Sequence, residues 1–103
     1  MSSYVQVIIS ATSKREAERI ATALVRKRLV AGTLIVKGDS RYWWNKKIVR
    51  KTYWNIQAFS LRRFKTKIIA SVKKLHSDEC PIIAFTKIDG NREFLKWVKE
   101  SVK

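Results

Sequence analysis

The stretch that decides the fold is residues 4–25, YVQVIISATSKREAERIATALV, in which a β-rich segment leads directly into a helical pattern. Its first part, residues 4–10, is rich in β-branched side chains and predicts a strand. Ser13 followed by Glu16 fits a capping box, in which each side chain satisfies a free amide at a helix start. Apolar residues at helical spacing then continue to a basic last turn near Arg28, which suits the negative end of the helix dipole.

The segment after this helix predicts a second strand and a long hairpin. Residues 29–36 read as a buried strand, and Gly-Asp-Ser at residues 38–40 is a turn signal. The chain then predicts a hairpin that bends near Asn45 and Lys46 and returns through a strand over residues 52–60.

The remaining segment repeats the pattern of a helix followed by a strand. Ser60 is expected to cap a second helix. The apolar face of that helix comprises Leu61, Phe64, Ile68, Val72 and Leu75. Residues 80–88 predict a fourth strand, and Asn91 is expected to cap a short C-terminal helix after a turn at Asp89 and Gly90. This order predicts an α+β, ferredoxin-like βαββαβ sandwich with a long hairpin between its second and third strands and an extra C-terminal helix.

Length and composition indicate one domain. The chain has 103 residues, of which 46% are apolar, and this is enough apolar material for one hydrophobic core. We therefore expect residues 1–103 to form a single domain. The one cysteine excludes an internal disulfide and disfavours a secreted, disulfide-stapled scaffold. No apolar run approaches the ~20 residues of a membrane-spanning helix, and the start lacks a signal-peptide pattern. We therefore expect a cytoplasmic protein with no membrane partner.

The positive charge is unevenly placed. The formal net charge is +15, and residues 40–77 contain no acidic residue but eleven basic ones. Within this region, basic and aromatic side chains alternate along the hairpin 41–54. The basic members are Arg41, Lys46, Lys47, Arg50 and Lys51, and the aromatic ones are Tyr42, Trp43, Trp44, Tyr53 and Trp54. Such a mixture predicts a nucleic-acid-binding surface, since bases stack on aromatic rings and cations follow phosphates.

A subunit interface explains the same aromatic residues. Trp43 and Trp44 are adjacent, so on a strand they face opposite sides and one of them leaves the core of its own sheet. The basic–Gly–aromatic motif of the ferredoxin-like RNA-binding module is absent from the expected third strand. We therefore favour an interface and keep nucleic-acid binding as the alternative.

The segment His76-Ser77-Asp78-Glu79-Cys80 gathers potential metal ligands. Imidazole and thiolate suit copper, which makes His76, Glu79 and Cys80 a candidate metal site. With one His and one Cys, a single chain cannot form a closed site of four Cys and His ligands, which leaves a site shared between subunits as the remaining arrangement. Alternatively, His76 ends the second helix and Cys80 fills core space. No nucleophile elbow or glycine-rich phosphate loop is present, so we expect no enzymatic activity.

Several motifs, in order and spacing, resemble those of a known family. They are Arg28-Leu29-Val30-Ala31, Ser40-Arg41-Tyr42-Trp43-Trp44, His76-Ser77-Asp78-Glu79-Cys80-Pro81 and Gly90-Asn91-Arg92-Glu93-Phe94-Leu95-Lys96-Trp97. Over nearly the whole chain the sequence resembles the CutA family of divalent-cation tolerance proteins. The resemblance implies a non-catalytic binding or regulatory homotrimer linked to metal tolerance, copper included. It also implies hairpins that pair between subunits and, by likeness to PII-type signalling trimers, a lateral cleft for a small ligand.

The resemblance assigns a set of residues to the ligand cleft or the trimer interface. They are Tyr42, Trp43, Trp44, Lys47, Tyr53, Trp54 and Trp97. The sequence departs from the family pattern mainly by losing acids near the hairpin. The residues at those positions are Asn45, Val49, Arg50, Lys51 and Tyr53. Because His76, Glu79 and Lys47 remain while those acids are lost, the cleft is expected to prefer a small anion.

Overall fold

The computed structural model of the protein describes residues 4–103. Its elements are β1 (Tyr4–Ala11), α1 (Lys14–Arg26), β2 (Gly32–Trp44), β3 (Lys47–Leu61), the helical turn η1 (Arg62–Phe64), α2 (Lys65–Leu75), β4 (Ile83–Lys87) and α3 (Arg92–Ser101). The strands form one antiparallel sheet in the order β2-β3-β1-β4. This confirms the α+β, ferredoxin-like prediction, including the extra C-terminal helix.

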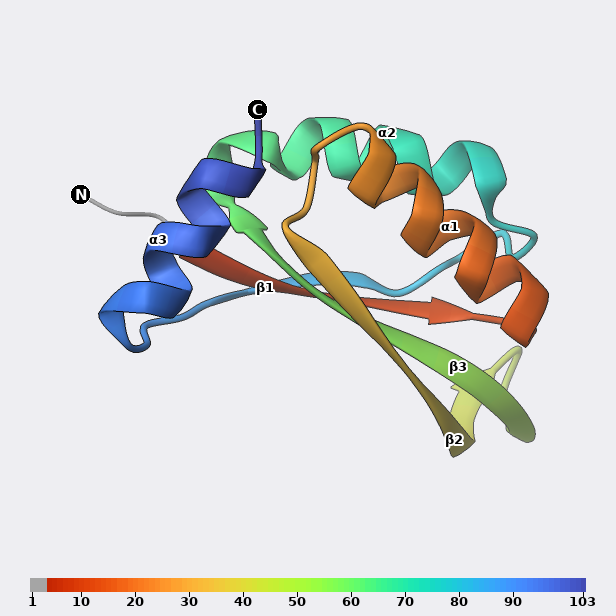
Figure 1. Ribbon diagram of the computed structural model, residues 1–103. Helices are drawn as coiled ribbons and strands as arrows, with labels where there is room; N and C mark the ends of the chain where they lie inside the picture. The colour runs from red at the N-terminus through yellow and green to blue at the C-terminus, as the bar shows by residue number, and fades with distance from the viewer. Residues whose placement is uncertain (1–3) are drawn as a thin grey trace.

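The core lies between one face of the sheet and helices α1 and α2, which run side by side across it (Figure 1). Alternate residues of β1, Val5, Val7 and Ile9, are buried on this face, as the pleat of a strand requires. From α1, Ile20 and Leu24 are fully buried against them. Burying one such side chain stabilises the fold by ~1.5–3 kcal/mol, so this two-layer contact holds the sheet in place.

The β2–β3 hairpin is longer than its sequence suggests, and its distal part projects away from the helices (Figure 1). The turn predicted at residues 38–40 is wrong, because these residues continue β2, with Gly38 paired to Tyr53. Strand pairing satisfies their backbone groups and outweighs the local turn preference. The predicted bend at Asn45 and Lys46 is confirmed: both have positive φ, 51° and 64°, as in the two-residue turns that match strand twist.

The cap predicted at Ser60 is also wrong. Ser60 is fully buried in β3 opposite Val5, and its hydroxyl donates to the Leu29 carbonyl at 2.6 Å. Sheet pairing extends through this position, and α2 instead follows the turn η1 without a side-chain cap. Other boundaries also moved: α1 ends at Arg26, the second strand is Gly32–Trp44, the third begins at Lys47, and the fourth is Ile83–Lys87.

The C-terminal helix begins as predicted, with Asn91 in the N-cap position, although the Asn91 side chain makes no capping hydrogen bond. Within residues 4–103, no helix has the length and apolar character needed to cross a membrane.

Candidate functional site

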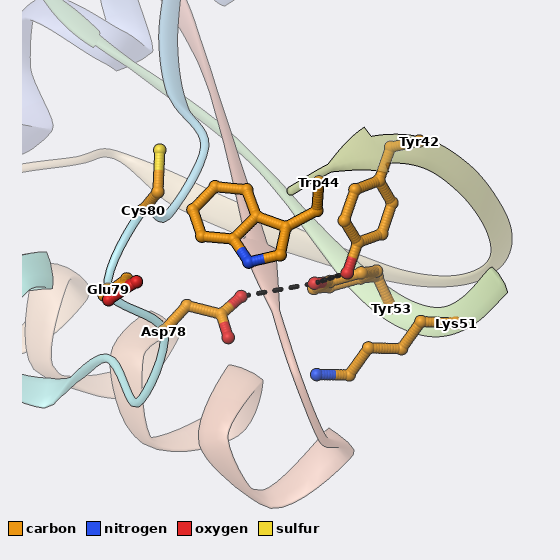
Figure 2. A pocket seen from close by; sticks show the side chains of 7 residues that line it. All are labelled: Tyr42, Trp44, Lys51, Tyr53, Asp78, Glu79 and Cys80. Carbon is orange, nitrogen blue, oxygen red and sulfur yellow. Dashed lines mark hydrogen bonds between the residues drawn. The ribbon is translucent and has the colours of Figure 1, made fainter. Parts of the chain in front are cut away.

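A pocket of about 270 Å³ lies between the distal hairpin and the loop that joins α2 to β4 (Figure 2). Its lining residues come from both segments. They are Tyr42, Trp44, Lys51, Tyr53, Asp78, Glu79 and Cys80. A larger hollow of about 530 Å³ shares several of these residues and continues over the face of the sheet opposite α1 and α2.

Strand register explains why these side chains face the pocket. Tyr42 and Trp44 are two residues apart on β2, and Lys51 and Tyr53 are two apart on β3, so each pair projects from one face. Tyr42 lies opposite Val49 and so shares a face with Lys51 and Tyr53. All four side chains therefore lie on the face away from α1 and α2. Gly38, opposite Tyr53, presents no side chain to this face, and a Cβ there would meet nothing within 4 Å.

A chain of hydrogen bonds connects the hairpin to the loop. The Tyr53 hydroxyl donates to Asp78 Oδ2 at 3.2 Å, and the Tyr42 and Tyr53 hydroxyls are 3.0 Å apart (Figure 2). Because the Tyr53 proton points at Asp78, Tyr42 must donate to Tyr53. Burial, the bond with Tyr42 and the charge of Asp78 all raise the pKa of Tyr53, so this phenol stays protonated and remains a donor.

The loop that carries Asp78 is attached to the start of α1 through Glu16. The buried Glu16 carboxylate accepts hydrogen bonds from the amides of Thr12 and Ser77, each at 2.8 Å. Burial by itself raises the pKa of Glu16, but the hydrogen bonds from Thr12 and Ser77 outweigh it and lower the pKa from 4.5 to about 2. Glu16 is therefore charged at neutral pH, and this charge holds the loop.

Only half of the predicted capping box forms. Ser13 accepts a hydrogen bond from the Glu16 amide at 3.0 Å, as expected. The Glu16 side chain, however, bonds Thr12 and Ser77 rather than the Ser13 amide. Sequence reasoning missed the attachment to Ser77 because that residue lies 61 positions away, and no local signal marks the contact.

His76 is a buried structural residue in this chain. It is the C-cap of α2, as one of the two interpretations predicted, and its side chain is 0% exposed. Its Nδ1 accepts a hydrogen bond from the Asp78 amide at 3.0 Å, so Nε2 carries the proton and donates to the Ser10 carbonyl. Neither ring nitrogen is left for a metal ion in this arrangement.

The other two predicted metal ligands, Glu79 and Cys80, are exposed in the pocket wall. The prediction that Cys80 fills core space is therefore wrong. Among residues 4–103, no three His, Cys, Asp or Glu side chains are grouped so that they could hold a metal ion. The donor set of a single chain does not fit a copper centre.

The predicted cleft residues separate into several places. Tyr42, Trp44 and Tyr53 line the pocket, whereas Lys47 is not among its lining residues. Trp54 packs against the core, and Trp97 of α3 lies over Gly32. The pocket also contains Asp78, which the sequence offered only within the segment of potential metal ligands, and two carboxylates with one lysine do not form an anion-preferring lining.

The basic residues of the hairpin also divide between its two faces. Arg41 lies opposite Arg50, and Trp43 opposite Ile48, on the side away from the pocket. Trp43 is 72% exposed there, while Arg41 is paired with Asp39 at 2.9 Å. Lys51 lies on the pocket face, so the five predicted cations do not form one continuous stripe.

The fold and the pocket together define a class of protein: a ferredoxin-like domain with an extended hairpin and a small polar and aromatic pocket at the distal end. A family model described as "CutA1 divalent ion tolerance protein" matches residues 5–101. The chain belongs to this family, as its motifs had suggested.

Individual relatives agree with this assignment. The chain is 35% identical to a divalent-cation tolerance protein CutA of Archaeoglobus fulgidus, over 94% of this chain and 96% of the relative. It is also 35% identical to the Thermus thermophilus protein of the same name, over 92% and 94%. A solved structure described as a periplasmic CutA from Archaeoglobus fulgidus superposes with a TM-score of 0.94 at 34% identity, covering 97% of this chain and 99% of that one.

Proposed function

We propose that this protein is a homotrimeric, non-catalytic binding or regulatory protein that serves divalent-cation tolerance. The main support for this assembly is the open face of the sheet, which is the face opposite α1 and α2. Leu34, Val36 and Ile82 are 58%, 44% and 56% exposed on it, although apolar side chains of this size are usually buried. A second copy would remove these side chains from water, and the family resemblance supports three copies.

Two sheet edges support the same proposal. In the order β2-β3-β1-β4, the outer strands β2 and β4 each pair on one side only within residues 4–103. Strand β2 spans Gly32–Trp44, and a long edge strand of this kind readily pairs with another chain. Pairing between copies would therefore satisfy backbone groups that a single chain leaves to water.

Charge works against this association. Each copy carries a formal charge of +15, so copies repel one another, and apolar burial with strand pairing must outweigh the repulsion. Salt screens the repulsion, with a Debye length of ~8 Å at physiological ionic strength. We therefore expect the trimer to be more stable at 0.15 M salt than at ~0.01 M salt.

Light scattering at micromolar concentration tests the assembly. Val36→Lys adds a charge to the open face and should shift the trimer towards monomers. Val25→Lys is the matched control, because Val25 is 41% exposed, close to the 44% of Val36, but lies on α1. A monomeric wild-type protein, or equal effects of the two substitutions, would refute the assembly.

The link to metal tolerance rests on the family, and we propose that the chain's available metal ligands are Glu79 and Cys80. Both are exposed, whereas His76 is buried and fully hydrogen-bonded, so a complete site would need residues of a second copy. Copper calorimetry should show weak uptake that Cys80→Ser reduces further. Tight stoichiometric uptake that survives Cys80→Ser would contradict this assignment.

Nucleic-acid binding by the other face of the hairpin is the second candidate, favoured by the exposure of Trp43 beside Arg50. Counterion release makes such binding fall by about 0.9 log units per log unit of salt for each DNA phosphate contacted. Filter binding that persists at 0.15 M salt and is lost in Trp43→Ala would support it. Loss of binding at that salt would indicate polyanion attraction alone.

We further propose a cytoplasmic location, where the exposed Cys80 thiol would stay reduced. The Archaeoglobus relative is described as periplasmic, so cell fractionation is a direct test.

A further inference from the structure

We propose that the pocket between the hairpin and the loop binds a small quaternary ammonium cation, held by the rings of Tyr42 and Trp44 and by the carboxylate of Asp78. This inference goes beyond the metal link and does not depend on a bound metal. It rests on the composition of the pocket, its charge and its size.

Aromatic rings form much of the pocket wall. Tyr42 and Tyr53 meet edge to face, with ring centroids 5.9 Å apart at 63°, and form a corner. Trp44 is 40% exposed, and its indole projects into the pocket from the hairpin (Figure 2). A cation within ~6 Å of such ring centroids is attracted by their electron-rich faces, which is how aromatic cages recognise quaternary ammonium groups.

The chain itself already places a cation against these rings. Lys51 Nζ lies 5.2 Å from the centroid of the Tyr53 ring. The geometry is therefore suitable for a positive group, while the faces of Tyr42 and Trp44 remain for a ligand. Because Lys51 is exposed and its side chain is flexible, it can move away when a second cation enters.

Carboxylates give the pocket a charge opposite to that of the protein. Asp78 uses Oδ2 to accept from Tyr53, and within residues 4–103 its Oδ1 has no hydrogen-bond partner. With Glu79, the lining has two acids against the single base Lys51, in a chain of net charge +15. A local negative site on a positive surface selects a cation over the many anions that the rest of the surface attracts.

The chemistry favours an organic cation over a metal ion. A metal site needs several convergent donor atoms, and residues 4–103 provide no such group. An alkylated ammonium needs only ring faces and one counter-charge, both of which are present. The volume of about 270 Å³ lies just below the ~300–1,000 Å³ of sites for drug-sized molecules, so the ligand must be small.

The test is a titration with choline, in the presence of a chelator that removes metal ions, followed by calorimetry or tryptophan fluorescence. The neutral control ligand is 3,3-dimethylbutan-1-ol, which has the same shape without the charge. We expect choline to bind about tenfold more tightly than the alcohol, as a partly desolvated cation–π contact predicts. Equal affinities, or no binding of choline at millimolar concentration, would overturn the proposal.

Three substitutions locate the site. Trp44→Ala should abolish binding, and Asp78→Asn should weaken it, since the amide keeps the shape and loses the charge. Lys51→Gln should strengthen binding by removing a like charge, whereas weaker binding would show that Lys51 helps to hold choline rather than opposing it and would refute the proposal. Trp97→Ala and Lys74→Gln, which lie on α3 and α2 outside the pocket, should have no effect.

The two proposals fail separately. Choline binding is measured at the pocket of whatever assembly is present, and light scattering of the same samples reports the number of copies. A monomer that binds choline would refute only the trimer, and a trimer that ignores choline would refute only the ammonium site.

Discussion

Replacing Glu16 with Gln should cost about 3 kcal/mol of stability at pH 7. The carboxylate is 8% exposed and accepts from the amides of Thr12 and Ser77, and these contacts lower the pKa of Glu16 from 4.5 to about 2. One pKa unit corresponds to about 1.4 kcal/mol of preference for the charged form, which gives this magnitude. Gln keeps the size of the side chain but presents one oxygen, and its NH₂ group must face an amide donor.

The pH dependence separates this electrostatic effect from a simple packing defect. Because folding lowers the pKa of Glu16, its contribution is complete above the unfolded pKa of 4.5 and is lost as the pH falls through about 2. The difference in unfolding free energy between wild type and Glu16→Gln should therefore be largest at pH 5–7 and shrink towards pH 2. Urea unfolding at equal protein concentration and ionic strength measures it.

The control is Glu18→Gln, an exposed residue of the same helix, for which we expect a change within about 0.5 kcal/mol. A Glu16→Gln effect below about 1 kcal/mol at pH 7, or one that is constant between pH 7 and pH 2, would refute the assigned role of the carboxylate.

Three further substitutions test other features of the fold. Ser60→Ala removes the buried hydroxyl that donates to the Leu29 carbonyl and should cost about 1–3 kcal/mol in urea unfolding, because that acceptor is left unpaired. Lys46→Gly should stabilise the protein by up to about 1 kcal/mol, measured in the same way, because φ is 64° at this position of the hairpin turn. Gly32→Ala would place a Cβ 2.9 Å from Trp97 and should displace that ring, at a cost of about 1–3 kcal/mol and with a changed tryptophan fluorescence spectrum.

Each of these three has an outcome that contradicts it. A neutral Ser60→Ala would mean that the Leu29 carbonyl finds another donor. If Lys46→Gly lowers the free energy of unfolding, the lysine side chain stabilises the turn by more than its positive φ costs. An unchanged fluorescence spectrum in Gly32→Ala would indicate that Trp97 does not lie over β2 in solution.

The sequence predicted most of the architecture because its strongest signals are local. The alternation in β1 and the apolar stripe of α1 report burial within a few residues, and both elements formed where expected. The errors occurred where distant pairing outweighs a local preference. Gly38 to Ser40 carry turn residues but are held in β2 by β3, and Ser60 carries a capping side chain but lies inside the sheet.

The residues of the pocket were indicated only in part. The family resemblance assigned Tyr42, Trp44 and Tyr53 to a ligand cleft or to a subunit interface, and in the single chain all three line the pocket. The presence of Asp78 beside them depends on how the loop after α2 passes the hairpin, which residue spacing does not specify. The burial of His76 likewise depends on its contact with Ser10, 66 positions away.

The attachment of the pocket loop has a consequence for how this site can change. The loop is fixed through two main-chain amides, that of Ser77 to Glu16 and that of Asp78 to His76, and the Asp78 side chain adds a contact to Tyr53 from within the pocket. Every non-proline residue carries such an amide. Substitutions at positions 79 and 80 can therefore alter what the pocket recognises while the loop keeps its place, which makes these two positions a suitable starting point for designing new ligand specificity on a small, fixed scaffold.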